Sequence, residues 1–156
     1  MNNTDSLPTV GAAPTILVVD DNKGVLDFLL LLLSKHGLSV IGAASGGECL
    51  AVAKSRRVDL IILDVMMPVM DGLQVCQELK RICPSVPVIL LTARDDMVTR
   101  AAAMDLGVSE FVAKPVNNRD LLNRVRTQLR SLEWDKATEQ GFSKIEQSTP
   151  APSNKK

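Results

Sequence analysis

One apolar segment of the chain stops abruptly at an acidic residue. Residues 58–63 read Val-Asp-Leu-Ile-Ile-Leu, Asp64 follows directly, and Pro68 and Gly72 lie in the segment that comes next. A short aliphatic and β-branched run bounded by Pro and Gly is typical of a buried strand in a parallel sheet. Because ligands of open α/β sheets bind at the carboxyl ends of the strands, Asp64 is a candidate site residue.

Strand-like and helix-like segments alternate along the whole chain. Strands are predicted at 15–19, 38–43, 58–63, 86–91 and 109–113, and helices at 22–36, 46–56, 72–83, 95–106 and 117–133. Such strand–helix units with short connections imply right-handed crossovers and a parallel sheet covered by helices on both faces. The length and the 46% hydrophobic content suit one core. We therefore expect an N-terminal arm at 1–13, one α/β domain at 14–133 and a polar, disordered tail at 134–156.

Charge and cysteine content exclude several classes of protein. The 18 basic and 18 acidic residues cancel, so no basic surface for nucleic acid or an anionic membrane is expected. Cys49, Cys76 and Cys83 are odd in number and lack CxxC spacing, which argues against a disulfide framework and a zinc site. The longest apolar run, 28–33, is too short to span a bilayer. We expect a cytoplasmic protein without membrane insertion or direct nucleic-acid binding.

A second strand places two more acids beside Asp64. The segment 15–19 ends at Asp20 and Asp21 in the same manner. Carboxyl ends of parallel strands meet at one edge of the sheet, so three carboxylates are expected to lie close together there. Like charges at this distance raise one another's pKa and need a counter-ion, for which the oxygen-preferring cation Mg²⁺ is suited.

Two further strand ends add a hydroxyl and an ammonium group to this edge. Thr92 follows the strand at 86–91, and Lys114 follows the strand at 109–113. A carboxylate with a divalent cation, a hydroxyl and a lysine can accept a phosphoryl group, because developing charge on the phosphoryl oxygens is neutralised.

This ordered set resembles the receiver domain of two-component response regulators over about residues 14–131. The residues that carry the resemblance are Asp20, Asp21, Asp64, Pro68, Gly72, Thr92, Ala93, Lys114 and Pro115. The resemblance implies a flavodoxin-like fold, with a five-stranded parallel sheet of order 2-1-3-4-5 flanked by five helices. It also implies a signalling switch whose partner-binding face changes, and which catalyses only its own phosphorylation and dephosphorylation.

The resemblance further assigns roles to individual residues of the acidic edge. Asp64 would be phosphorylated by a histidine kinase or a histidine phosphotransfer protein. Asp21, Asp64 and the carbonyl of Met66 would bind Mg²⁺ directly, and Asp20 would hold the ion through water.

Other implied roles concern the response to phosphorylation. Thr92 and Lys114 would bind the phosphoryl oxygens, and Phe111 matches the family's switch aromatic. The Lys114–Pro115 bond would be cis, and Met66 and Arg94 would flank the path of an attacking water.

Each residue also has an ordinary structural interpretation. An Asp at a strand end or Thr92 can simply cap a helix, Lys114 can be a solvated charge, and Phe111 can be a core aromatic. An aspartyl phosphatase similar to haloacid dehalogenases is one alternative function, but such enzymes place a DxD nucleophile on the first strand. A receiver-like module that binds partners without phosphorylation is another, against which the complete acid, Thr and Lys set argues.

Partner surfaces are predicted less sharply. In the first helix Val25, Phe28, Leu29, Leu32 and Leu33 follow core spacing, which leaves Leu26, Leu30 and Leu31 either to dock a partner helix or to widen the buried stripe. The charged residues Arg100, Asp105, Glu110, Asp120, Arg124 and Arg126 partly match the dimer face of transcription-factor receivers, although Ser109 departs from it. A phosphorylation-dependent homodimer and a merely solvated surface both remain open. The methionines Met66, Met67 and Met70 are expected to pack rather than to bind a soft metal.

Overall fold

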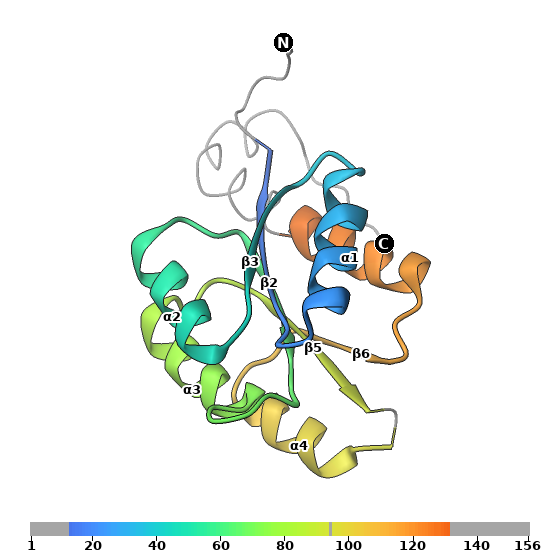
Figure 1. Cartoon of the computed structure of the whole chain (residues 1–156). Coiled ribbons are helices and arrows are strands. Elements are labelled where there is room, and N and C mark those ends of the chain that lie inside the picture. The colour runs from blue at the N-terminus through green and yellow to red at the C-terminus, as the bar shows by residue number, and fades with distance from the viewer. Residues whose placement is uncertain (1–12, 94, 132–156) are drawn as a thin grey trace, which may run out of the picture.

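The computed structural model describes residues 13–93 and 95–131 (Figure 1). The elements are β2 (Thr15–Val19), α1 (Lys23–Ser34), β3 (Ser39–Ala43), α2 (Gly46–Ser55), β4 (Leu60–Asp64), α3 (Gly72–Ile82), β5 (Val88–Ala93), α4 (Met97–Asp105), β6 (Glu110–Lys114) and a last helix at 118–131. The tail predicted at 134–156 lies outside the described residues, as does the predicted arm except for residue 13.

The strands form one parallel sheet with the predicted order. Neighbouring strands follow the sequence β3-β2-β4-β5-β6, which in chain order is 2-1-3-4-5. In the register, Asp64 pairs with Leu91, and Ala93 pairs with Lys114. The carboxyl ends of the strands therefore lie along one edge, which confirms the predicted fold class.

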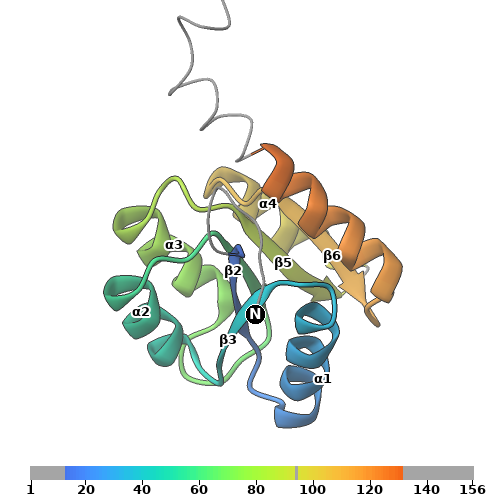
Figure 2. The ribbon, with the colours of Figure 1, turned by 90° about the horizontal axis from the view of Figure 1, so that it is seen from above.

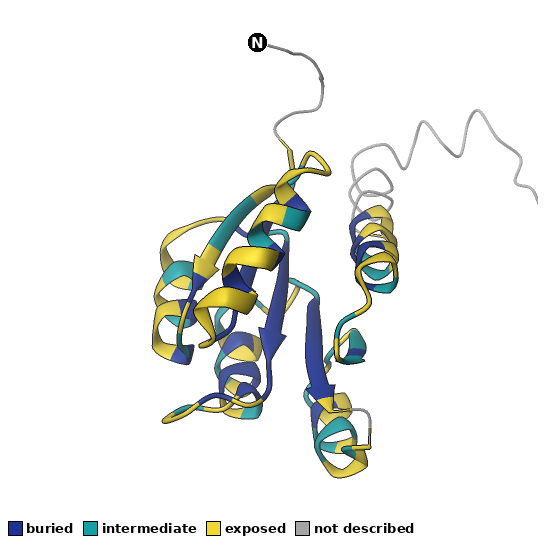
Figure 3. Cartoon of the chain, turned by 45° about the vertical axis from the view of Figure 1, so that its right-hand side comes forward, coloured by how far each residue is buried: buried dark blue, intermediate teal, exposed yellow. Residues whose placement is uncertain are grey.

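Helices cover both faces of the sheet and enclose two hydrophobic clusters. On one face, Leu17, Ile61, Leu63 and Leu90 pack with α2, α3 and Ala103 of α4. On the other, Ile16, Leu60, Ile62 and Ile89 pack with α1 and the last helix. Figure 2 shows α2 and α3 on one side of the sheet and α1 on the other, and Figure 3 shows the buried central strands. Because successive side chains of β4 enter opposite clusters, its sequence is apolar without alternation.

Three strands continue one or two residues beyond their predicted ends. Asp64, Thr92 and Lys114 are themselves strand residues, since each still pairs with a neighbouring strand or lies in its register. A hydrophobic pattern stops at the first polar residue, whereas the backbone ladder does not. The polar groups of the site are consequently fixed by the sheet.

The buried face of α1 differs from the prediction. Leu26, Leu29 and Leu33 are buried, whereas Val25 and Phe28 are exposed to solvent, so the prediction that Val25 and Phe28 lie in the core is wrong. A run of consecutive apolar residues fits more than one helical phase, and in the structure Leu26, Leu29 and Leu33 are the ones that pack against the sheet. Leu30 and Leu32 are partly buried and widen the stripe, whereas Leu31 is exposed, so the two alternatives left open for these leucines each hold for one of them.

Two turns use the left-handed backbone conformation, and the predicted end of the first helix is nearly correct. Gly37 has φ of 83° and Gly107 has φ of 82°, values that glycine adopts without strain. Helix α1 ends at Ser34, two residues before the predicted end, and the His36 ring nitrogen Nδ1 lies 3.0 Å from the Leu32 carbonyl oxygen.

No helix in the described ranges is both long enough and apolar enough to cross a membrane.

Candidate functional site

Asp64 and Lys114 form an ion pair across the carboxyl edge of the sheet. Asp64 ends β4, Lys114 ends β6, and their atoms Oδ1 and Nζ are 2.6 Å apart. The backbone N–H of Met66 also donates to Oδ1, at 3.3 Å. The Asp64 residue is only 2% exposed, so the lysine compensates a buried negative charge. Lys114 is therefore not simply a solvated charge.

Asp20 contributes a buried carboxylate whose hydrogen bonding is incomplete. Its Oδ1 accepts the N–H of Asn22 at 2.9 Å, whereas its Oδ2 is buried and has no hydrogen-bond partner among the described residues. Burial raises the pKa of Asp20, the charges of Asp64 and Asp21 raise it further, and the Asn22 N–H and the Lys114 charge oppose this rise. An unsatisfied buried acceptor is unfavourable unless another group, such as a cation, approaches it.

Asp21 completes an acidic triad with Asp20 and Asp64. One carboxylate oxygen from each residue lies within 4.8 Å of the others, and Asp21 is exposed to solvent. All the donors are hard oxygen atoms, which bind Mg²⁺ in proteins. The unpartnered Oδ2 of Asp20 and the clustered charges both fit a divalent cation at this position.

The loop after β4 approaches the site closely and depends on glycine. A Cβ atom on Gly72 would lie 2.7 Å from the Val65 Cα and 2.9 Å from the Asp64 carbonyl oxygen, so a larger residue would push the loop away. The Gly72 N–H donates to the Val65 carbonyl at 2.9 Å. Val69 in the same loop has φ of 69°, an unfavourable value for a β-branched residue. The loop is thus held in a strained conformation beside Asp64.

Thr92 and Phe111 lie on the same face of the sheet. Thr92 pairs with Ala113 and Leu90 pairs with Phe111, so strand alternation directs all four side chains to one side. Thr92 is buried, and the hydrogen bond that its hydroxyl makes within the described residues is a long one, 3.5 Å to the Ala93 carbonyl. Phe111 is partly buried against the cluster on that face. Thr92 does not cap the helix that follows, because Asp96 does so.

Two expectations about the loops have clear outcomes. The Lys114–Pro115 peptide bond is cis, as the resemblance implies. Met67 is buried and Met70 packs against the core, but Met66 is 71% exposed, so the prediction that Met66 packs is wrong. Met66 follows the strand end, where its backbone N–H is directed to Asp64 while its side chain faces solvent.

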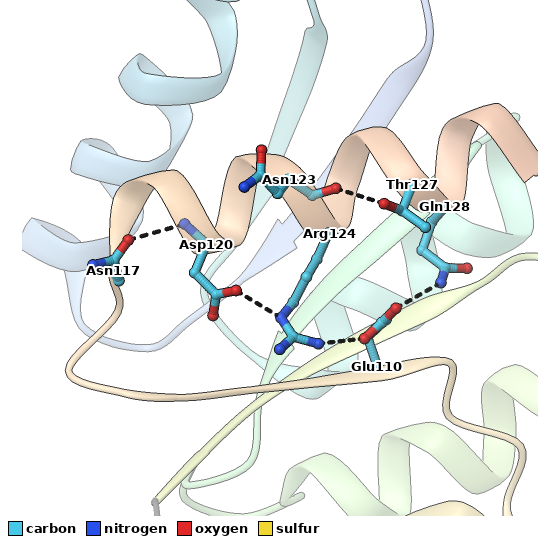
Figure 4. Close-up of polar contacts among 7 residues, drawn as sticks. All are labelled: Glu110, Asn117, Asp120, Asn123, Arg124, Thr127 and Gln128. Carbon is cyan, nitrogen blue, oxygen red and sulfur yellow. Dashed lines mark hydrogen bonds and ion pairs between the residues drawn. The ribbon is translucent and has the colours of Figure 1, made fainter.

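Three residues of the predicted charged face, Glu110, Asp120 and Arg124, form a network within the chain (Figure 4). Arg124 donates to Asp120 Oδ1 at 3.0 Å and also to Glu110, and Gln128 donates to Glu110 Oε2 at 3.2 Å. Glu110 and Asp120, two of the acids that were candidates for bridges between two molecules, therefore already have partners. Gln128 was not among the predicted residues, although its position one helical turn after Arg124 places it on the same face of the helix.

A comparison with protein families decides the family of the chain. A model of the response regulator receiver domain matches residues 16–126. The chain belongs to the response regulator receiver family. Receiver domains of this family act in two-component signalling. This assignment agrees with the fold and with the residues gathered at the carboxyl edge.

Relatives of this receiver include the response regulator MprA of Mycobacterium tuberculosis, which is 42% identical over 124 residues, or 80% of this chain and 54% of the relative. MprA of Mycobacterium leprae is 41% identical over the same length. The chain thus spans about half the length of the curated relatives it matches.

Among solved structures, a CheY-like receiver domain protein from Methanospirillum hungatei has a TM-score of 0.77 at 28% identity and covers 80% of this chain and 99% of that one. Chemotaxis protein CheY4 of Vibrio cholerae has a TM-score of 0.72 at 30% identity and covers 76% of this chain and 100% of that one.

Proposed function

We propose that this receiver is a phosphoacceptor switch of a two-component phosphorelay, phosphorylated on Asp64 in a Mg²⁺-dependent reaction. The observation that carries the proposal is the position of Asp64 at the end of the central strand β4, beside Asp20 and Asp21 and 2.6 Å from the Lys114 ammonium. A nucleophilic carboxylate, oxygen ligands for a cation and a mobile positive charge are the groups that phosphoryl transfer requires.

The proposed reaction uses each of these groups in one step. A carboxylate oxygen of Asp64 attacks the phosphorus of a phosphohistidine on the partner, so that a P–O bond forms while the P–N bond breaks. Asp21, Asp64 and the Met66 carbonyl would hold Mg²⁺, and Asp20 would hold it through water. The ion would supply positive charge for the phosphoryl oxygens. Lys114 exchanges its contact with Asp64 for one with a phosphoryl oxygen.

We further propose that phosphorylation alters the face formed by α4, β6 and the last helix. Thr92 moves toward the phosphoryl group, and Phe111, on the same face of the sheet, moves toward the position that Thr92 leaves. The burial of Thr92 and the weakness of its present hydrogen bond support this movement, because little must be broken. Thr92 and Phe111 lie on one face of the sheet, which supports a movement that involves both.

The proposed phosphoryl donor is a histidine kinase or a histidine phosphotransfer protein in the cytoplasm. The exposed residues Val25, Phe28 and Leu31 form an apolar patch on α1, the helix that starts directly after Asp21. A helix of the donor that packs on this patch would bring its phosphohistidine near Asp64. The receiver itself would catalyse only its own phosphorylation and dephosphorylation, with residues 14–133 as the folded unit.

A phosphorylation-dependent homodimer is a second proposal for the same state. Because Arg124 already binds Glu110 and Asp120, dimerisation through this face would exchange pairs within one molecule for pairs between two. Light scattering with and without beryllofluoride and Mg²⁺ tests this proposal, and an unchanged monomer mass would contradict it.

Intact-mass spectrometry after incubation with Mg²⁺ and acetyl phosphate tests the central proposal. We expect one added phosphoryl group in the parent protein, none in Asp64→Asn, and none after removal of Mg²⁺ with a chelator. Asp27→Asn, which changes an exposed acid of α1, serves as the matched control and should be labelled like the parent. Labelling that persists in Asp64→Asn would refute the assignment.

A further inference from the structure

Helix α4 is held to the rest of the protein by few buried side chains. Ala103 is its one fully buried residue, whereas Met97, Val98 and Met104 are largely exposed. A short helix with so little buried apolar surface has a low local stability and opens more readily than the core. Individual contacts that fix its position therefore matter more than they would in α1 or α3.

Arg100 makes such a contact with β6. The central carbon of its guanidinium lies 5.7 Å from the centroid of the Phe111 ring. A guanidinium over an aromatic face is attracted by the ring quadrupole, and more strongly where water is excluded. The Arg100 Nε is buried and has no hydrogen-bond partner among the described residues. The guanidinium thus lies over the ring although the Nε–H group has no hydrogen-bond partner there.

The charges around Arg100 favour the same arrangement. Asp96, the N-cap of α4, lies one turn before Arg100, and its pKa is lowered by hydrogen bonds from Thr99 and, to a smaller extent, by the Arg100 charge. This weak attraction lies on α4 itself, so it does not tie the helix to the sheet. Contact with the ring, in contrast, joins α4 to β6.

We infer that Arg100 is a positioning residue whose guanidinium, placed over the Phe111 ring, latches α4 to β6 and sets the resting position of the α4 surface. Its meaning for signalling rests on the proposed function, because Phe111 lies on the same face as Thr92. If Phe111 moves after phosphorylation, the ring must leave the guanidinium first. The latch would then add to the free energy needed to reach the active state. Arg100 would thereby act inside one molecule, and not only as a surface charge for dimerisation.

Hydrogen exchange and fluorine NMR on the full chain test the latch directly. The variants are Arg100→Gln, which removes the charge, Arg100→Lys, which keeps a cation, and Arg119→Gln, a matched change at an exposed arginine of the last helix. The chain has three phenylalanines, so fluorophenylalanine gives three resonances, and Phe111→Leu identifies the one from Phe111. Each protein is measured without phosphodonor and again with Mg²⁺ and beryllofluoride.

In the state without phosphodonor, Arg100→Gln should speed exchange of the α4 amides by about fivefold, the factor expected from losing one cation–π contact. The Phe111 resonance should shift in the same variant, Arg100→Lys should recover part of both effects, and Arg119→Gln should show neither. Equal α4 exchange in Arg100→Gln and the parent, or equal acceleration in Arg119→Gln, would overturn the latch. With beryllofluoride, the Phe111 resonance should respond at lower concentration in Arg100→Gln. A resonance that never responds, together with faster α4 exchange in Arg100→Gln, would support the latch while refuting the proposed switch.

Discussion

Lys114 Nζ lies 2.6 Å from Asp64 Oδ1, although β6 and β4 are not neighbours in the sheet. The lysine reaches past the end of β5 to a carboxylate that is almost completely buried. Because the Lys114 side chain is itself 37% exposed, water weakens the ion pair. The pair therefore contributes as much by positioning the Lys114 ammonium beside Asp64 as by stabilising the fold. We expect a group that already contacts the Asp64 carboxylate to follow the phosphoryl group in the proposed phosphorylated state.

Lys114→Ala should separate phosphorylation from signalling. We expect the variant to accept a phosphoryl group on Asp64 but to lose the response of the Phe111 resonance to beryllofluoride, because nothing pulls the end of β6 toward the phosphoryl group. Lys80→Ala, at an exposed position of α3, should behave like the parent. A normal Phe111 response in Lys114→Ala would show that the lysine does not transmit the change.

Asp20→Asn should stabilise the protein in the absence of divalent cations. The folded-state pKa of Asp20 is raised above the ordinary value of 3.8, chiefly by burial, so the charged form destabilises the folded state. The folded state is therefore most stable, with respect to this group, below the unfolded pKa, where the Asp20 carboxyl is protonated. This stability is lost as the pH rises through the raised folded pKa. At neutral pH the amide avoids the penalty, and a gain of about 1 kcal/mol would raise Tm by roughly 3–6 °C.

Thermal melts of the parent and Asp20→Asn across pH check this linkage. The difference in Tm should shrink as the pH falls toward 3.8, because the parent carboxyl becomes protonated. Added Mg²⁺ should also shrink it at neutral pH, since the ion binds the charged parent more tightly than the variant and therefore stabilises the parent more. A difference that is independent of pH would show that ionisation of Asp20 is not its cause.

Asp21→Ala should weaken Mg²⁺ binding without disturbing the fold. Asp21 is exposed, so its removal leaves no cavity, but one carboxylate of the triad is lost. By titration calorimetry we expect an affinity lower by about tenfold or more, as losses at metal sites commonly are. Asp27→Ala is the control for an exposed acid close by in sequence. Unchanged Mg²⁺ affinity in Asp21→Ala would refute the proposed coordination.

The orientation of α1 about its own axis predicts very different losses of stability when either of two nearby leucines is replaced by alanine. Leu29 is 1% exposed and Leu31 is 55% exposed, although the two lie in one apolar run. Leu29→Ala should lower the free energy of unfolding by about 2–5 kcal/mol through lost burial and a residual cavity. Leu31→Ala should change it by roughly 0.5 kcal/mol or less, as surface substitutions do. Urea denaturation measures both, and similar losses would mean that the helix is rotated differently.

The contrast between α1 and β4 shows why the sequence predicts some features and not others. In β4 both faces are buried, so the prediction of the strand does not depend on which side chains point to which face. The position of Asp64 at its end follows from the place of Asp64 in the sequence. For α1, the phase decides which leucines are buried, and a continuous apolar run does not determine it. Parallel pairing similarly brings Asp20, Asp64 and Lys114 together whatever their rotamers.

Residues outside the sheet were harder to predict. The exposure of the Met66 side chain depends on the path of a loop that Gly72 holds close to Val65. The contact between Arg100 and Phe111 depends on where short loops place α4, and the periodicity of apolar residues does not predict that position. Patterns of apolar residues describe the sheet and its helices, whereas loop paths depend on close contacts between specific atoms.

Met66 should prolong the lifetime of the phosphorylated state. Hydrolysis needs a water molecule held in line with the bond between Asp64 and phosphorus. A polar side chain in the right position can hold the water there. The Met66 side chain is exposed two residues after Asp64, but its thioether is a very weak acceptor and cannot orient this water. Arg94, the other residue expected to flank the path, lies outside the described residues.

Met66→Asn places an amide where it can hold the attacking water, while the backbone carbonyl and the N–H bonded to Asp64 are retained. We expect loss of the phosphoryl group to be on the order of tenfold faster than in the parent, because correct placement of a reacting water strongly accelerates its attack. Met66→Leu, which adds no polar group, and Met104→Asn, which adds an amide on exposed α4, should both decay like the parent. The measurement is a time course of intact mass after the phosphodonor is removed. Because the substituted side chain is exposed, slower or equal decay in Met66→Asn cannot be ascribed to unfolding, and it would show that this residue does not limit hydrolysis.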